Sequence, residues 1–257
     1  MHLKGFLIDL DGVLYIGGKP VPGAAETIRY LDRHGYPYRF VSNTTRKSRR
    51  SIAAHLGSLG LQVSASLIFT PPAAAVSHML REGRTRCLLL TTCDVHTEFT
   101  GSGITVAEES VDFVVVGDAG DNFTYDLMNK AFRMVLGGAG ILALEKDRYW
   151  MGAGGMMLSA GPFVAALEYA TGARAELVGK PSARFFELAL RDMGISASGA
   201  AMIGDDLFTD VGGALASGLT GILVRTGKFR PDLLQDPASP SPDAVLDSIS
   251  DLPDILG

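Results

Sequence analysis

Short apolar runs alternate along the chain with segments of helical period, and this alternation limits the folds that the chain can adopt. Buried parallel strands form nearly continuous apolar runs because helices cover both of their faces. The apolar runs are residues 5–12, 38–43, 66–70, 87–92, 112–117, 141–144, 200–204 and 220–224. The segments with helical spacing are residues 22–33, 48–59, 125–136, 162–171, 183–193 and 211–217. The pattern predicts an α/β protein with parallel sheets wrapped by helices.

The alternation restarts twice, and the restarts indicate two domains. The first break is Pro71-Pro72, after the third strand, and the second lies near Glu176. The simplest arrangement is a Rossmann-like, doubly wound core of residues 1–72 and 176–257, with an α/β cap domain of residues 73–175 inserted in it.

The composition supports a globular protein and excludes several other classes. Hydrophobic residues make up 47% of the 257 residues and charged residues 20%, which excludes disorder and coiled coil. The net charge is −5, so neither nucleic acid nor an anionic membrane surface is an expected partner. A small anionic substrate remains compatible with this charge, because one site can be locally positive.

The cysteines and the N-terminus favour a cytoplasmic location. Cys87 and Cys93 are the two cysteines, too few for a disulfide framework or a four-ligand zinc site. We expect two partly buried thiols in a reducing compartment. No apolar run approaches the about 18 residues of a membrane span, and the chain enters its first strand without a secretory signal.

Polar residues follow several strands of the predicted core, where ligands bind in open α/β sheets. Asp9 and Asp11 lie two residues apart on one face of a strand, so their charges repel unless a cation lies near them. Carboxylate oxygens, a few waters and a phosphate oxygen are the ligands that Mg²⁺ prefers. The candidate residues at this edge are Asp9, Asp11, Ser42, Asn43, Lys180, Asp205, Asp206 and Asp210.

This set of residue types suits phosphoryl transfer. One carboxylate can attack phosphorus to give an aspartyl-phosphate, and the other can supply and remove protons. A lysine and a hydroxyl can neutralise and orient the phosphoryl oxygens. Each motif alone has an ordinary structural explanation: a turn, a helix N-cap or a surface lysine. Their joint placement at one sheet edge favours the chemical interpretation.

The motifs resemble those of the haloacid dehalogenase superfamily. They are Asp9-Leu10-Asp11-Gly12-Val13-Leu14-Tyr15, Ser42-Asn43, Gly179-Lys180-Pro181, and Gly204-Asp205-Asp206 with Asp210. The first motif and the length of the insert are similar to the NagD or 4-nitrophenylphosphatase-like subclass. Within it, the chain most resembles the phospholysine phosphohistidine inorganic pyrophosphate phosphatase branch. The resemblance covers essentially the whole chain.

The resemblance implies roles for the first two motifs. Asp9 is expected to be the nucleophile and a Mg²⁺ ligand. Asp11 is expected to be the general acid and base, with its backbone carbonyl on the metal. Ser42, with Asn43, is expected to hold the transferring phosphoryl group. Ser42 stands where the subclass more often has Thr, and the hydroxyl is retained.

The resemblance also implies roles for the last two motifs. Lys180 is expected to pair with Asp9 and the phosphate, and Asp205 to bind the metal. Asp210 is expected to orient either metal-bound water or Lys180. Asp206 stands where relatives often carry Asn, so its role stays open.

The cap is expected to cover the site and to select a small phosphorylated substrate, through residues within 91–97 and 152–157. The basic run 46–50 is expected to be a solvated helix face, with steering of anionic substrates as the alternative. The resemblance leaves a homodimer through the cap open.

Other functions compete with a phosphatase. A phosphotransferase or mutase could use the same motifs, and a non-catalytic phospho-ligand binder would normally have lost Asp9 or Asp11. A receiver-like signalling domain would be shorter, and a dehalogenase would need no metal-binding Asp205.

Overall fold

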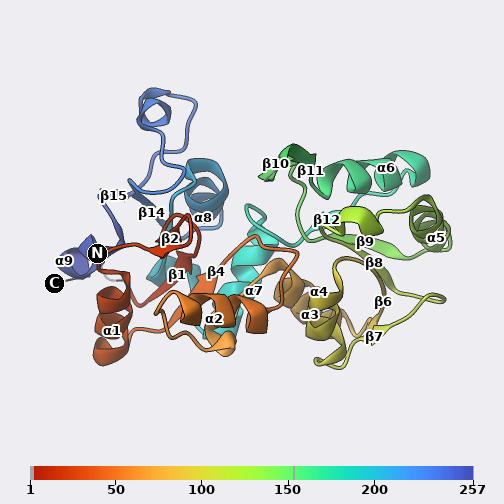
Figure 1. Ribbon diagram of the computed structural model, residues 1–257, viewed down its shortest axis with the longest axis horizontal. Coiled ribbons are helices and arrows are strands. Elements are labelled where there is room, and N and C mark those ends of the chain that lie inside the picture. Colours follow the sequence, from red (N-terminus) through yellow and green to blue (C-terminus); the bar gives the residue numbers. More distant parts are fainter. Residues whose placement is uncertain (1–2, 153, 257) are drawn as a thin grey trace. The chain divides into compact units, whose positions relative to one another are not determined.

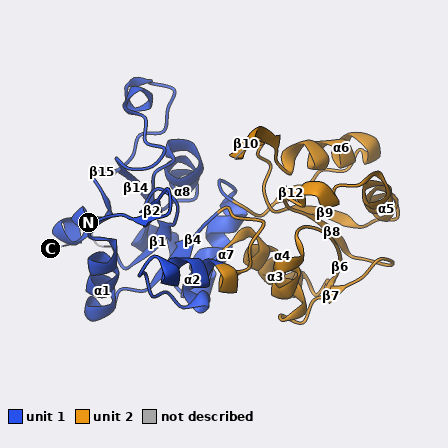
Figure 2. Cartoon of the chain, viewed as in Figure 1, with its two compact units in different colours: residues 1–42, 52–69, 180–257 blue, residues 43–51, 70–179 orange. Residues whose placement is uncertain are grey.

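The chain divides into two compact units, each an α/β structure with its own parallel sheet (Figures 1 and 2). The computed structural model describes residues 3–152 and 154–256. Unit 1 consists of Met1–Ser42, Ile52–Phe69 and Lys180–Gly257, and unit 2 consists of Asn43–Ser51 and Thr70–Gly179. The α/β class predicted from the alternation is confirmed.

Unit 1 is built on a six-stranded parallel sheet in the order β15-β14-β13-β1-β4-β5. The strand order reverses between β1 and β13, as in doubly wound sheets. The strands are β1 (Gly5–Asp9), β4 (Tyr38–Val41), β5 (Ile68–Phe69), β13 (Ala200–Gly204), β14 (Thr220–Val224) and β15 (Ala244–Leu246), with a separate antiparallel pair β2 (Tyr15–Ile16) and β3 (Lys19–Pro20). The helices are α1 (Ala24–His34), α2 (Arg49–Ser58), which begins in unit 2, α7 (Ala183–Met193), α8 (Gly213–Ala216) and α9 (Leu252–Leu256).

Alternate residues of the unit 1 strands face opposite layers of helices. Ile8 of β1 packs with Leu31 of α1 in one buried cluster, which Ile68 of β5 joins. The next residue, Phe69, packs edge-on against Phe185 of α7, with ring centroids 5.4 Å apart. Helices therefore cover both faces, which explains why the strands are apolar throughout.

Unit 2 repeats this arrangement on a five-stranded parallel sheet in the order β12-β9-β8-β6-β7. Val114 and Val116 of β8 pack with α5 and α6, whereas Phe113 contacts His78 of α3. The strands are β6 (Arg86–Leu90), β7 (Thr105–Val106), β8 (Phe113–Val116), β9 (Gly140–Ala143) and β12 (Glu176–Leu177), with an antiparallel hairpin β10 (Tyr149–Gly152) and β11 (Gly155–Leu158). The helices are α3 (Pro71–Glu82), α4 (Cys93–Thr100), α5 (Tyr125–Leu136) and α6 (Gly161–Thr171).

Several elements differ from the sequence-based expectation. Pro71-Pro72 begins α3, because a proline fits the first turn of a helix, where its missing N–H has no partner to lose. Residues 93–97, which follow the strand expected at 87–92, form the first part of α4. The glycines at 152–155 belong to a hairpin, and Ala153 lies outside the described residues. The last strand, β15, lies in a tail with no clear apolar run.

Short helical turns connect many of these elements. They are η1 (Ala65–Leu67), η2 (Gly120–Asn122), η3 (Ala197–Gly199), η4 (Leu207–Gly212, of the π type), η5 (Pro231–Gln235) and η6 (Ile249–Asp251). η1 shortens the strand expected at 66–70 to Ile68–Phe69, and η4 replaces the start of the helix expected at 211–217.

Two expectations drawn from composition can be compared with the structure. Cys87 is buried, but Cys93, the first residue of α4, is exposed, so the expectation of two partly buried thiols is wrong. Among the helices formed by the described residues, none combines the length and the apolar character needed to cross a membrane.

Candidate active site at the edge of the unit 1 sheet

Three buried carboxylates meet at the carboxyl edge of the unit 1 sheet. β1 ends at Asp9, and the neighbouring strand β13 ends one residue before Asp205, so parallel pairing places these two side by side. Asp210 comes from η4, directly after β13. One carboxylate oxygen from each of the three residues lies within 4.8 Å of the others. We call Asp9, Asp205 and Asp210 the carboxylate cluster.

A buried lysine joins two members of the carboxylate cluster. The Nζ atom of Lys180 donates hydrogen bonds to Asp9 Oδ1 at 2.5 Å and to Asp210 Oδ1 at 2.6 Å. Lys180 and Asp210 have relative exposures of 5% and 1%, so these are ion pairs screened from water. The structure thus brings together the nucleophile candidate, the lysine and two further acids that the sequence singled out.

Glycine is required beside Asp205. Gly12 has φ +90° and Gly227 has φ +59°, and a Cβ atom at either position would overlap Asp205 Oδ2. The backbone N–H of Lys228 donates to the same oxygen at 2.7 Å. Thr226 Oγ1 donates to the carbonyl of Gly12 at 2.5 Å and so joins the two glycine loops. The loops after β1 and β14 therefore fix one oxygen of Asp205.

Burial raises the pKa of each acid in the carboxylate cluster. It raises the pKa of Asp9, against the effect of Lys180, and raises the pKa of Asp205 to about 6. Burial also raises the pKa of Asp210 to about 6, with a further contribution from the charge of Asp9. Burial alone would lower the pKa of Lys180, but the charges of Asp210 and Asp9 raise it. One lysine therefore does not neutralise the three acids.

The carboxylate cluster has the chemistry of a magnesium site. Its donors are all carboxylate oxygens, which suit a hard divalent cation, and it contains neither the imidazole nor the thiolate that zinc or copper would favour. A divalent cation would also supply the positive charge that Lys180 alone does not. The residues present therefore fit Mg²⁺.

Asp11 is not a member of the carboxylate cluster. It is exposed and forms a backbone bridge with Tyr15 at the turn after β1. Burial, together with the charges of Asp11 and Asp9, raises the pKa of the Tyr15 hydroxyl to about 12. The side chain of Asp11 is thus accessible to water, whereas that of Asp9 is buried.

The remaining candidates have distinct surroundings. Ser42 is buried after β4 and its N–H donates to the carbonyl of Phe69 at 3.3 Å. Asn43 belongs to unit 2, where a Cβ atom on Gly179 would lie 3.1 Å from Asn43 Oδ1. α2 begins at Arg49, so neither Ser42 nor Asn43 is its N-cap.

Asp206 has a structural role that the sequence left open. Its Oδ1 accepts hydrogen bonds from the N–H groups of Phe208 and Thr209 at 3.0 and 2.9 Å, which caps η4. Its own N–H donates to Asp210 Oδ2 at 3.2 Å. Asp206 therefore fixes the turn that carries Asp210.

Sequence reasoning missed residues 226–228. Thr226, Gly227 and Lys228 follow β14 at the same sheet edge, and Lys228 Nζ lies 3.8 Å from Asp206 Oδ2. Their position directly after the strand predicted at 220–224 could have suggested that they lie at the site. A Thr-Gly-Lys sequence in a loop does not by itself indicate a catalytic or binding role.

Known proteins resemble this chain in sequence and in fold. The "Haloacid dehalogenase-like hydrolase" family model matches residues 6–105, and a second, HAD-hydrolase-like, matches residues 177–252. The human phospholysine phosphohistidine inorganic pyrophosphate phosphatase is 39% identical over 260 residues, which cover 99% of this chain and 94% of the relative. This chain belongs to the haloacid dehalogenase-like hydrolases. The sequence-based resemblance is thus confirmed.

Other relatives and solved structures agree with this assignment. The mouse "Haloacid dehalogenase-like hydrolase domain-containing protein 2" is 42% identical over 89% of this chain and 86% of the relative. The 4-nitrophenylphosphatase of Thermotoga maritima has a TM-score of 0.88 and 29% identity, covering 98% of this chain and 96% of that one. NagD of E. coli has a TM-score of 0.88 and 27% identity, covering 97% and 98%. This haloacid dehalogenase-like hydrolase is therefore a phosphohydrolase.

The glycine requirement at Asp205 can be tested by substitution. Gly12→Ala forces a methyl group against Asp205 at a positive φ, and overpacking of this kind costs about 1–3 kcal/mol. Gly18→Ala is the matched control, because Gly18 has φ +77° with no atom within 4 Å of the added methyl group. Both variants suffer backbone strain of about 1–2 kcal/mol, because alanine is unfavourable at a positive φ. Gly12→Ala should therefore lower the free energy of unfolding in urea by more than Gly18→Ala does. Equal losses would contradict the account.

The Lys180 ion pairs predict a second stability effect. Lys180→Met leaves two buried carboxylates without their cation, so the free energy of unfolding at pH 7 should fall by about 3–5 kcal/mol. Lys130→Met removes only the exposed pair with Glu108 and should cost less than about 1 kcal/mol.

The stability lost in Lys180→Met should depend on pH. Without Lys180 the pKa values of Asp9 and Asp210 rise further, so the cost should shrink as the pH falls and the two acids bind protons. Denaturant titrations at pH 5 and pH 7.5 measure it. A cost that is independent of pH would show that lost packing, and not charge, is the cause.

Proposed function

We propose that this protein is a Mg²⁺-dependent phosphatase that hydrolyses phosphate esters or phosphoanhydrides through an aspartyl-phosphate on Asp9. The observation that carries the proposal is the ion pair of buried Asp9 with Lys180, beside Asp205 and Asp210 at the carboxyl edge of a doubly wound sheet. This edge is where ligands bind in such sheets.

In the first step, a carboxylate oxygen of Asp9 attacks phosphorus, and the bond from phosphorus to the leaving oxygen breaks. Asp11 gives its proton to the leaving oxygen. In the second step, Asp11 takes a proton from water as the water oxygen attacks the same phosphorus, and the bond from phosphorus to Asp9 breaks. The exposure of Asp11 supports this role, because a group that exchanges protons must reach water or substrate.

Lys180 has two tasks in this mechanism. It opposes the effect of burial on Asp9 and so favours the ionised nucleophile, and it contributes positive charge near the phosphoryl oxygens. Asp210 accepts a hydrogen bond from Lys180 at 2.6 Å, which supports a role in orienting the lysine. Ser42 and Asn43 would hold the phosphoryl group.

Asp9, Asp205 and the backbone carbonyl of Asp11 would hold Mg²⁺. When bound, the ion supplies positive charge to the phosphoryl oxygens and lowers the repulsion between them and the carboxylates. The raised pKa of Asp205, about 6, supports this assignment, because such an oxygen gains most from a neighbouring cation.

The two units would divide the work. Unit 1, which carries the carboxylate cluster, would perform the chemistry, and unit 2 would act as the cap that selects a small phosphorylated substrate. The human and bovine phosphatases similar to this chain are named for phospholysine, phosphohistidine and inorganic pyrophosphate, so compounds with phosphorus–nitrogen or phosphoanhydride bonds are the first candidates.

Hydrolysis of an aryl phosphate tests the proposal. Turnover should require Mg²⁺, be lost with EDTA, and fall by more than about 10³-fold in Asp9→Asn, since loss of a nucleophile is rarely compensated. Asp254→Asn, an exposed acid in α9, is the matched control and should keep full activity.

Two results would contradict the proposal. Activity that survives in Asp9→Asn would exclude Asp9 as the nucleophile. Transfer of the phosphoryl group to an added alcohol in preference to water would favour a phosphotransferase instead.

A further inference from the structure

The segment that follows Ser42 packs with unit 2, although residues 52–69 separate it in sequence from the rest of that unit. Residues 43–51 are clustered by their contacts with 70–179, and the unit boundary falls between Ser42 and Asn43. The basic run 46–50 lies inside this segment, where a solvated helix face was expected. Its arginines at 46 and 49 instead form ion pairs within unit 2.

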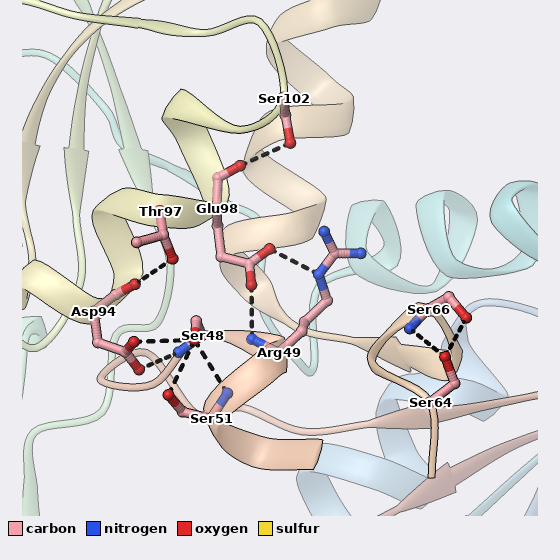
Figure 3. A network of polar contacts seen from close by, with 9 residues as sticks. All are labelled: Ser48, Arg49, Ser51, Ser64, Ser66, Asp94, Thr97, Glu98 and Ser102. Atoms are coloured by element: carbon pink, nitrogen blue, oxygen red, sulfur yellow. Dashed lines mark hydrogen bonds and ion pairs between the residues drawn. The ribbon is translucent and has the colours of Figure 1, made fainter. Parts of the chain in front are cut away.

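Two acids on α4 hold the start of α2 (Figure 3). Asp94 accepts hydrogen bonds from Ser48 N at 2.7 Å and from Ser48 Oγ at 3.0 Å. Glu98 accepts from Arg49 N and from Arg49 Nε, both at 2.7 Å. Asp94 and Glu98 are four residues apart and so share one face of α4. We call them the α4 acidic pair.

The start of α2 needs acids from outside its own sequence. Its first turn contains no acidic residue and begins with Arg49 and Arg50, which are unfavourable at the positive end of a helix. Burial alone would raise the pKa of Asp94, but hydrogen bonds from Ser48 and Ser51 lower it. Asp94 is therefore charged at neutral pH and compensates the helix end.

The same segment also contacts the ends of the unit 2 strands. Thr92, after β6, donates through Oγ1 to the carbonyl of Arg46 at 2.8 Å. Asp118, after β8, donates through its N–H to Thr45 Oγ1 at 3.1 Å and accepts from Arg46 Nη1 at 3.3 Å. A Cβ atom on Gly117 would lie 3.3 Å from the Cβ atom of Thr45. The carboxyl edge of this sheet, an ordinary ligand position, therefore holds part of the protein's own chain.

These contacts hold residues 45–49, which directly follow Ser42-Asn43 and Thr44 in the chain, against α4 and the strand ends of unit 2. We propose that the α4 acidic pair is a positioning device for catalysis: it fixes the segment that begins at Asn43 and thereby sets the place of the Asn43 amide. This inference rests on the proposed function, in which Asn43 contacts the transferring phosphoryl group. Asp94 and Glu98 then act by positioning Asn43. Asp94 lies within residues 91–97, which were expected from the sequence to select the substrate.

A double-mutant cycle tests the proposal. The variants are Asp94→Ala with Glu98→Ala, Asn43→Ala, and all three changes together, assayed with an aryl phosphate and Mg²⁺ below the unfolding temperature of each. Loss of the acidic pair should lower kcat about 10- to 100-fold, as expected for a misplaced contact group. It should also weaken inhibition by inorganic phosphate, measured as the inhibition constant.

The decisive comparison is in the Asn43→Ala background. If the acidic pair acts through Asn43, its removal there should change kcat by less than about 2-fold, because the affected contact is already gone. A merely structural role would give the same fold-loss in both backgrounds and leave phosphate inhibition unchanged. Equal losses, or no loss in the native background, would overturn the proposal.

Further variants control for folding and chemistry. Asp94→Asn with Glu98→Gln retains acceptor oxygens and should recover most of kcat, and Thr100→Ala, at an exposed position of α4, should keep it all. If circular dichroism shows that the double alanine variant does not fold, Asp94→Ala alone replaces it. The same comparison of kcat losses in the native and Asn43→Ala backgrounds then applies. An inactive wild type would overturn the proposed function itself, whereas an active wild type with equal losses would overturn only this inference.

Discussion

A buried ammonium group between two carboxylates is the interaction on which the carboxyl edge of the unit 1 sheet depends. Lys180 compensates Asp9 and Asp210 where neither can be solvated, and a buried acid without its cation would cost several kcal/mol. Asp205 has no hydrogen bond from Lys180, and burial, with a further contribution from the charge of Asp210, raises its pKa to about 6. The strand order and the glycines at 12 and 227 serve this arrangement, because they place the acids close together where a divalent cation fits.

The two units use the same sheet architecture for different purposes. In unit 1, the carboxyl edge of the parallel sheet carries the carboxylate cluster. In unit 2, the corresponding edge binds residues 45 and 46 of the chain itself through Thr92 and Asp118. On our proposals, the second sheet therefore contributes to catalysis by supporting the segment that starts at Asn43.

The sequence predicted those parts of the fold and site that follow from strand ends and helical period. Helices 125–136 and 183–193 and strands 200–204 and 220–224 have the predicted bounds, because their apolar patterns are regular and their ends are marked by glycine or capping residues. The meeting of Asp9, Asp205 and Asp210 was predictable because parallel strands deliver their carboxyl ends to one edge, whereas the pairing of Lys180 with Asp9 was an expectation from the family resemblance.

Other features depended on tertiary contacts that no local pattern records. α3 begins with two prolines and continues with alanines, so its helical period is weak. The contacts of residues 226–228 with the site, and those of the α4 acidic pair with α2, join segments distant in sequence. The role of Asp206 as a cap of η4 required the turn geometry itself.

The central claim is a covalent phosphoryl intermediate on Asp9, and trapping it is the most direct test. Wild-type protein mixed with a substrate carrying a radioactive phosphoryl group and Mg²⁺, then quenched in acid, should retain label that hydroxylamine releases, as expected for an acyl phosphate. The label should map to the peptide containing Asp9 and be absent from Asp9→Asn. Turnover without any trapped label under rapid quench, or label on another residue, would contradict the account.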